Sequence, residues 1–233
     1  MRKIIGTVTL GLLITASSGA WAGEKGSFYL RGDVGAAQIG GNKGVIGDLG
    51  NPPDEVDFNK EVTPNAQVGV GYYFADTFRL EAIAGNNFKR QISGDYTNDG
   101  SPIANDGQVD VESLYGLIAV SADLQAAFGI QDTPWMPYVS AGAGVSRNKL
   151  GQFDFSPSLG QYIVGNSNTS LAWTIGLGTG YRINQQWVFD VGYRYMDLGK
   201  AMSSKSSNVE TLRSPLEFDV TSHVLNVGVR YEF

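Results

Sequence analysis

Apolar and polar residues alternate with a period of two along most of the chain, in segments of about ten residues. Near the end, Leu225 and Val227 share one face, whereas Asn226, Gly228 and Arg230 share the other. Successive side chains of a β-strand point to opposite faces, so this period predicts strands with one apolar face. No segment after residue 22 approaches the run of about 20 apolar residues that a membrane-spanning helix needs. With 31 glycines and 11% aromatic residues, the composition also favours strands, and we expect an all-β fold.

The connections between the alternating segments differ in length. We expect strands over residues 27–38, 65–74, 78–82, 111–122, 137–146, 170–182, 187–195 and 220–233. The links 75–77 and 183–186 are very short, whereas the long polar connections cover residues 39–64, 88–110, 147–169 and 197–219. Short turns at one rim and long loops at the other are typical of an up-and-down barrel that crosses a membrane. The link 123–136 is long on the short-turn side, and we expect it to fold against the periplasmic rim.

The polar faces of these segments carry glycines and charges of both signs. A soluble lipocalin-like barrel or a sandwich is the alternative fold, but its core could not hold these charges without a large desolvation cost. The narrow polar interior of an eight-stranded membrane barrel lets opposite charges pair. We therefore predict an eight-stranded antiparallel up-and-down transmembrane β-barrel, closed by pairing of its first and last strands. Its predicted lumen network consists of Arg31, Asp33, Arg79, Glu81, Asp190, Arg194, Arg230 and Glu232.

The first 22 residues differ in character from the rest of the chain. Arg2 and Lys3 precede an apolar run, which ends in small residues and the triplet Ala20-Trp21-Ala22. A charged start, a short apolar stretch and an A-x-A site are the pattern of a secretory signal peptide. We expect residues 1–22 to be removed and residues 23–233 to form the barrel. The chain has no cysteine, which excludes disulfides, thiolate metal sites and cysteine nucleophiles.

Three stretches, 137–145, 192–199 and 227–233, resemble the small outer-membrane β-barrel superfamily of Gram-negative bacteria, which includes OmpA/OmpX-like and opacity or surface-antigen porin-family barrels. The resemblance implies residence in the outer membrane, in contact with its lipid and lipopolysaccharide. A terminal Phe233 with Tyr231 two residues before it resembles the signal that the barrel-assembly machinery recognises in this family. The superfamily contains adhesins, surface antigens, structural anchors and a few lipid-modifying enzymes, so the resemblance leaves the function open.

Motifs that could carry chemistry are weak. The single histidine, His223, adjoins Ser222, but neighbouring strand residues face opposite ways, so a Ser-His catalytic pair is not expected there. The glycines of 176–180 lie within a strand and not in a strand-to-helix turn, which excludes a typical phosphate loop. Residues 95–106 partly follow the calcium-loop pattern, but a solvated acidic loop explains them better than a weak calcium site. We expect no catalytic residue, no cofactor and no metal.

The predicted function is that of a non-catalytic surface protein with adhesion, surface-antigen or envelope-structural roles. Loops on a rigid scaffold usually carry binding, and the aromatic residues Phe153, Phe155 and Tyr162 are the expected loop contacts to a host or environmental protein. A net charge of −6 and the acidic first loop argue against nucleic acid or another polyanion as partner. A small porin or passive channel is the alternative function, and a lipid-modifying outer-membrane enzyme is a third.

Overall fold

A computed structural model describes residues 23–40, 42–46, 54–98, 101–130, 133–156, 160–208, 212 and 214–233. The expected signal peptide lies outside these residues. The secondary-structure elements are β1 (Phe28–Ile39), β2 (Lys43–Ile46), β3 (Asp54–Phe58), β4 (Glu61–Tyr73), β5 (Phe78–Asn98), β6 (Ser101–Asp123), α1 (Leu124–Ala127), β7 (Trp135–Ser156), β8 (Gln161–Ile163), β9 (Ser167–Arg182), β10 (Trp187–Met202) and β11 (Leu216–Glu232). In the described part of the chain, no helix is long and apolar enough to cross a membrane.

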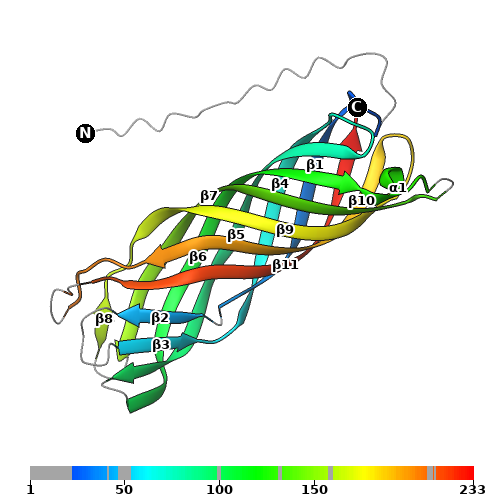
Figure 1. The fold of residues 1–233 in the computed structure, drawn as a ribbon. Helices are drawn as coiled ribbons and strands as arrows, with labels where there is room; N and C mark the ends of the chain where they lie inside the picture. The colour runs from blue at the N-terminus through cyan, green and yellow to red at the C-terminus, as the bar shows by residue number, and fades with distance from the viewer. Residues whose placement is uncertain are drawn as a thin grey trace, which may run out of the picture.

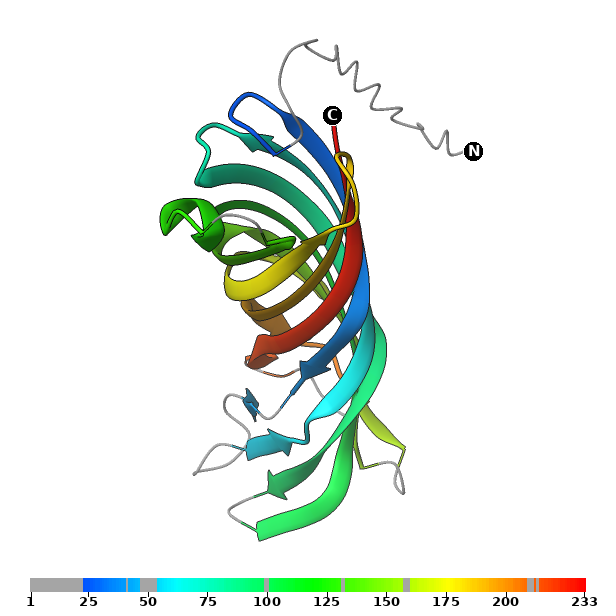
Figure 2. The ribbon, with the colours of Figure 1, turned by 90° about the vertical axis from the view of Figure 1, so that its right-hand side faces the viewer.

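Eight long strands form a closed ring in the order β1, β4, β5, β6, β7, β9, β10 and β11. All neighbours are antiparallel, and β11 pairs with β1 from Tyr29 opposite Glu232 to Ile39 opposite Ser222. Figures 1 and 2 show the strands winding obliquely around a common axis. The prediction of an eight-stranded antiparallel barrel closed by its first and last strands is confirmed.

A short hairpin continues the wall where two strands of the ring stop. Strands β1 and β4 end near Ile39 and Glu61, well before their neighbours do. Beyond them, β2 pairs with β11 at Leu216 and Glu217, β3 pairs with β5, and β2 and β3 pair with each other. Figure 2 shows this hairpin below the shorter strands, at the end opposite the C-terminus. We call the part of the wall built by β2, β3, β8 and the distal halves of β5, β6, β7, β10 and β11 the extension.

The extension corrects the expectation of four long loops. Much of 88–110, 147–169 and 197–219 is strand, since β5 continues to Asn98, β6 begins at Ser101 and β7 continues to Ser156. In these segments the apolar residues, such as Ile92 and Val109, point inward and are buried. Outside the bilayer a wall faces water, so the apolar face turns to the interior. Because the apolar face changes sides in the extension, the sequence prediction made β5, β6, β7 and β10 too short.

The outer wall of the ring is apolar, as the alternation predicted. Side chains with large exposed fractions include Val34, Val68, Ile118, Ile175, Leu177 and Leu225. Aromatic pairs mark the rim near the C-terminus, with ring centroids 5.0 Å apart for Trp187 and Tyr231 and 4.9 Å apart for Trp135 and Tyr181. An apolar band bordered by aromatic residues is the lipid-facing surface of a membrane barrel.

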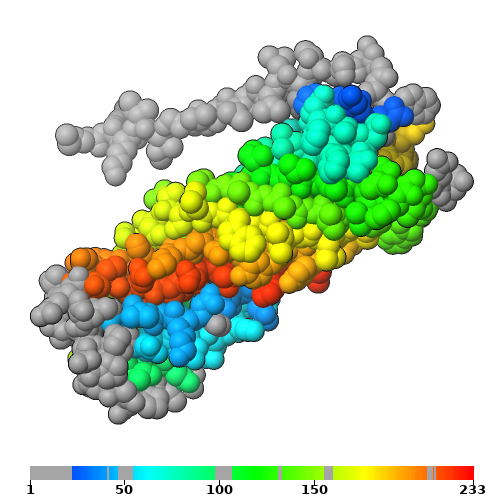
Figure 3. Space-filling model, viewed as in Figure 1, coloured from blue at the N-terminus to red at the C-terminus, as the bar shows by residue number. Residues whose placement is uncertain are grey.

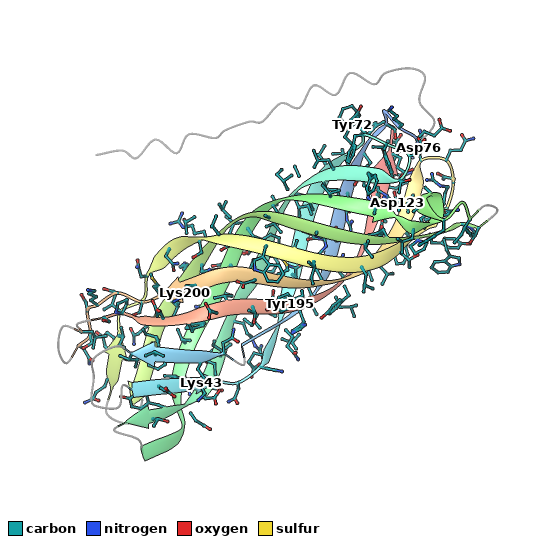
Figure 4. All side chains as sticks on the ribbon, viewed as in Figure 1. Lys43, Tyr72, Asp76, Asp123, Tyr195 and Lys200 are labelled. Atoms are coloured by element: carbon teal, nitrogen blue, oxygen red, sulfur yellow. The ribbon has the colours of Figure 1, made fainter. Side chains whose placement is uncertain are left out.

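The two ends of the elongated body, which Figure 3 shows in space-filling form, differ in their connections. Figure 4 places Asp76 and Asp123 near the C-terminal end, and Lys43 and Lys200 at the extension. The link from β6 to β7 begins with α1 and lies at the rim of the short links, where Pro134 accepts a hydrogen bond from the Arg182 backbone. Short turns face the periplasm in barrels of this kind, so the extension faces the cell exterior.

One glycine on the luminal side of β4 allows a tyrosine to cross it. Tyr29, Gly71 and Glu81 are consecutive cross-strand partners on β1, β4 and β5, and a Cβ at Gly71 would overlap the Tyr29 ring. We expect Gly71→Ala to lower the free energy of unfolding by about 1–3 kcal/mol, as overpacked cores do. Gly116→Ala is the matched control, because its Cβ would meet no heavy atom within 4 Å. Urea titration of both variants in lipid vesicles would measure the difference, and equal stabilities would contradict the packing of Tyr29 over Gly71.

Candidate functional site: the barrel interior

The half of the interior nearer the C-terminal rim is centred on Glu81. Its carboxylate accepts a hydrogen bond from Tyr29 Oη at 2.5 Å and lies 3.5 Å from Arg31 Nη1. Arg79 Nε lies at 3.6 Å and Arg194 Nη2 at 3.9 Å. All these side chains project from the barrel wall into the interior and are buried there. Three guanidinium groups from β1, β5 and β10 thus share one carboxylate.

A second group of charges surrounds Arg230 near the rim. Arg230 Nε lies 3.3 Å from Glu232 Oε1 and 3.6 Å from Asp190 Oδ2, and Nη1 donates to Tyr73 Oη at 3.1 Å. Arg182 Nη1 closes this end with a 2.9 Å bond to Glu232 Oε2. Neighbouring luminal positions on β11 therefore present both signs of charge to β10 and to the rim.

Amide side chains join these charges to the rest of the wall. Asp33 accepts two bonds from Arg31, at 2.7 Å and 2.9 Å, and further bonds from Gln67 at 3.0 Å and Asn226 at 3.2 Å. Gln67 in turn accepts a bond from Arg194 at 3.1 Å. The structure thus places all eight residues of the predicted lumen network inside the barrel, in two groups of contacts. Arg79, which also pairs with Asp123, belongs to the first group.

Sequence reasoning assigned no role in the lumen to its tyrosines or to Asp123. Tyr29, Tyr115 and Tyr138 stand opposite Gly71, Gly85 and Gly178 of the neighbouring strands, and in each case the tyrosine side chain covers the glycine. The guanidinium carbon of Arg79 lies 4.5 Å from the Tyr138 ring centroid, and that of Arg230 lies 5.3 Å from that of Tyr29. These contacts stabilise cations that have little access to water. Period-two alternation gives Tyr29, Tyr115 and Tyr138 the luminal face, but the cross-strand register that joins each tyrosine to a glycine was not available from the sequence.

Charge balance explains how such a cluster can be buried. Five arginines, Arg31, Arg79, Arg182, Arg194 and Arg230, pair with Asp33, Glu81, Asp123, Asp190 and Glu232. A buried charge is tolerated when it is paired and hydrogen-bonded, whereas removing one partner leaves an uncompensated charge. The interior at this level is therefore a plug of paired charges.

The half of the interior inside the extension is apolar. Phe58 packs against Phe218 and Phe153, with ring centroids 4.7 Å and 6.3 Å apart, among buried Ile92 and Leu216. Burial of such a cluster holds the extension together without lipid around it. The barrel is thus filled by charged and amide side chains at one level and by apolar side chains at the next.

The expected loop contacts fall in different places. Phe153 is 0% exposed, so the expectation that it anchors a partner at the surface was wrong. The sequence predicts Phe153 in the long polar connection 147–169, but β7 continues through this position and Phe153 packs in the core of the extension. Tyr162 on β8 is partly exposed, and the side chain of Phe155 lies outside the described residues.

The remaining motifs show no catalytic arrangement in the described part of the chain. His223 lies on the outer wall, where Nδ1 is 2.7 Å from Tyr193 Oη, whereas Ser222 is buried on the luminal side beside Asn87. Gly176 and Gly178 lie within β9, and a Cβ at Gly176 would meet Arg194 at 2.8 Å. Tyr96 of the 95–106 segment pairs with Ile103 in a hairpin, and no metal-binding group of His, Asp or Glu occurs among the described residues.

The predicted assembly signal lies on the outer wall of the last strand. The rings of Tyr231 and Phe233 are 5.0 Å apart at the aromatic rim, and the Phe233 amide donates to Phe28 O at 2.9 Å. The end of β11 is therefore paired and ordered by the neighbouring first strand.

An antiparallel eight-stranded ring with an apolar outer band and a paired-charge lumen defines a small outer-membrane β-barrel. Comparison with known proteins agrees, since residues 8–233 match the family model of the outer membrane protein beta-barrel domain. The chain belongs to this family. It resides in the outer membrane of a Gram-negative cell.

The chain is similar to two curated proteins in sequence and to one solved structure in fold. Outer membrane protein PagN of Salmonella typhimurium is 25% identical over 179 residues, which cover 71% of each chain. A Rickettsia felis protein named "Putative adhesin" is 26% identical over 241 residues and covers 100% of both chains. The crystal structure of the outer membrane protein OprG from Pseudomonas aeruginosa has a TM-score of 0.59 at 18% identity, covering 90% of this chain and 97% of that one. The last likeness concerns the fold alone.

Proposed function

We propose that this outer-membrane barrel is a non-catalytic, non-conducting surface protein that binds partners through the outside of its extension. The observation that carries the proposal is the filling of the interior, charged at one level and apolar at the next. A filled barrel offers solutes no wide path, while the extension presents a rigid surface beyond the bilayer. The Rickettsia felis relative whose name marks it as an adhesin supports the same role.

The partner that we infer is a protein surface with cationic groups. The outside of the β2–β3 hairpin carries Glu55 and Asp57, and Lys43 is already engaged by Glu55 at 3.5 Å. Acidic side chains on the outer surface repel polyanions and attract cationic patches. Of the three aromatic loop contacts expected from the sequence, Tyr162 remains the proposed one. Its side chain is partly exposed in the described part of the chain.

Binding can be tested by charge reversal on the hairpin. We expect the Glu55→Lys, Asp57→Lys variant to lose attachment of bacteria to host cells or matrix, with association slowed about tenfold or more at low salt. Glu24→Lys, Asp76→Lys is the matched control, since it makes the same charge change at the opposite rim, where Asp76 is exposed. Purified protein in planar bilayers should show no steady conductance.

Two results would contradict the proposal. Equal attachment by the hairpin variant and the parent protein would show that the extension is not the binding surface. A steady conductance, unchanged when the extension is trimmed to short turns, would favour the alternative of a passive channel.

Assembly of the barrel is a further part of the proposal. We infer that Tyr231 and Phe233 form the signal through which the barrel-assembly machinery receives the chain, and that residues 1–22 direct it out of the cytoplasm. Two features support this role, namely the aromatic contact between these two residues and the position of β11 as the last strand to close the ring. Lipid and lipopolysaccharide surround the apolar band of the assembled barrel.

A further inference from the structure

A trough of about 450 Å³ runs along the lipid-facing wall over β1, β4, β5 and β6. Its lining is small and apolar, and includes Gly32, Val34, Ala66, Val68, Ala84 and Leu114. Gly32, Val68 and Ala84 are consecutive cross-strand partners, so the small residues lie side by side. A Cβ at Gly32 would meet no heavy atom within 4 Å. The trough is therefore open outward, at the level where acyl chains surround the barrel.

A charged hollow adjoins the trough on the side of the extension. It has a volume of about 60 Å³ and is lined by Lys89, Asp110, Glu112 and Lys149. Asn86 lines the trough and donates from Nδ2 to Glu112 Oε1 at 3.3 Å, so this bond lies where the two depressions meet. An apolar trough that ends in a charged hollow matches the two parts of a lipid, its acyl chain and its headgroup.

Two cations at this junction remain unpaired within the described residues. Lys89 bonds to Asp110 at 2.7 Å, and Arg90, outside the hollow, bonds to Glu61. Arg147 and Lys149 on β7 are exposed and form no ion pair with any described residue. The register places Arg147 opposite Leu114 of the trough and Lys149 opposite Glu112 of the hollow. Both cations are thus available to a phosphate at the end of an acyl chain.

The carboxylates of the hollow indicate what else the headgroup must contain. Asp110 and Glu112 lie between the lysines and accept hydrogen bonds, and they would repel a headgroup that carries phosphate alone. A sugar supplies hydroxyl donors for these carboxylates, and its phosphate can reach Arg147 and Lys149. We propose that the outer wall of β1, β4, β5, β6 and β7 binds a phosphorylated acyl glycolipid, lipid A of the outer leaflet, with an acyl chain in the trough.

Native mass spectrometry of the full barrel, refolded in detergent, would test this site. The probes are bisphosphorylated lipid A, dephosphorylated lipid A and phosphatidic acid, whose headgroup is phosphate alone. We expect the wild-type protein to retain bisphosphorylated lipid A in preference to the other two. The Arg147→Gln, Lys149→Gln variant should bind it more weakly, by about fivefold for each charge removed. Gly32→Leu should also weaken binding, because the new side chain fills the trough.

The matched control is the Lys43→Gln, Lys200→Gln variant. It removes the same charge from the extension outside the site, where Lys43 and Lys200 are paired with Glu55 and Glu217, and should retain lipid A as the parent does. Heat-modifiable migration in gels would show that each variant is folded. Equal retention of phosphatidic acid by the wild type, or unchanged retention in both site variants, would overturn the proposal. None of these results depends on attachment to host cells, so the site and the proposed function can fail separately.

Discussion

Replacing Glu81 by glutamine should lower the free energy of unfolding by about 3–5 kcal/mol, the usual cost of leaving buried charges without a partner. The glutamine has nearly the same shape, so the loss would come from the charge. Arg31, Arg79 and Arg194 would then face a neutral amide, and Tyr29 would donate to a weaker acceptor. Reversible urea unfolding in lipid vesicles would measure the change.

Glu217→Gln provides the comparison on the extension. Its carboxylate pairs with Lys200 Nζ at 2.8 Å, but both side chains are more than 40% exposed. Exposed pairs contribute about 0–1 kcal/mol, so this variant should be nearly as stable as the parent. The hydrogen bond to Glu217 raises the pKa of Lys200. A Glu81→Gln barrel as stable as Glu217→Gln would show that the luminal charges are not held as a plug.

The face assignment and the luminal charges were predictable because the bilayer imposes a strict rule on each strand. Val34 and Asp33 are adjacent in sequence, yet one is 62% exposed and the other 4% exposed, as alternation requires. Charged side chains of both signs on one face of the strands cannot face lipid, so they must point into the lumen. The pairing of β1 with β11 followed from the need to leave no open edge.

The extension was not predictable by the same rule because its surroundings differ. Ile92 and Phe153 are apolar and alternate with polar neighbours, as the lipid-facing residues do, but they point inward. Water replaces lipid beyond the band, so the same pattern has the opposite orientation. Irregular pairing between Asn87 and Arg90 marks the region of β5 where this change occurs. Such a register shift depends on the partner strand and leaves little trace in one sequence.

The lumen contacts depend on register as well as on parity. Tyr29 reaches Glu81 because Gly71 lies between them on β4, and only the pairing of three strands brings these residues into line. Likewise, Asp123 sits at the end of β6, where the sequence places a strand boundary, and its pairing with Arg79 follows from the β5–β6 ladder. Sequence alternation gives each side chain a face, whereas contacts across strands require the alignment of the strands.

An arginine in place of Val227 should destabilise the barrel by about 2–4 kcal/mol, the cost of a cation facing lipid near the bilayer midplane. Val227 is 43% exposed on β11 and lies among the apolar side chains of the lipid-facing band. Its cross-strand partners are Val34 and Val191, so no carboxylate stands opposite to receive the guanidinium. Unfolding by urea in vesicles, compared with the parent protein, would give the difference in free energy.

Val45→Arg makes the same substitution at a valine of similar exposure, 37%, on β2 of the extension. Its cross-strand partners are Glu55 and Glu217, both acidic, and the wall there faces water. A surface substitution of this kind changes stability by about 0.5 kcal/mol or less. The contrast between two valines of similar exposure separates lipid from water as the surrounding medium, because exposure alone predicts little difference. If Val45→Arg were the more damaging change, the apolar band would lie at the extension, and the barrel would be placed in the membrane at the wrong height.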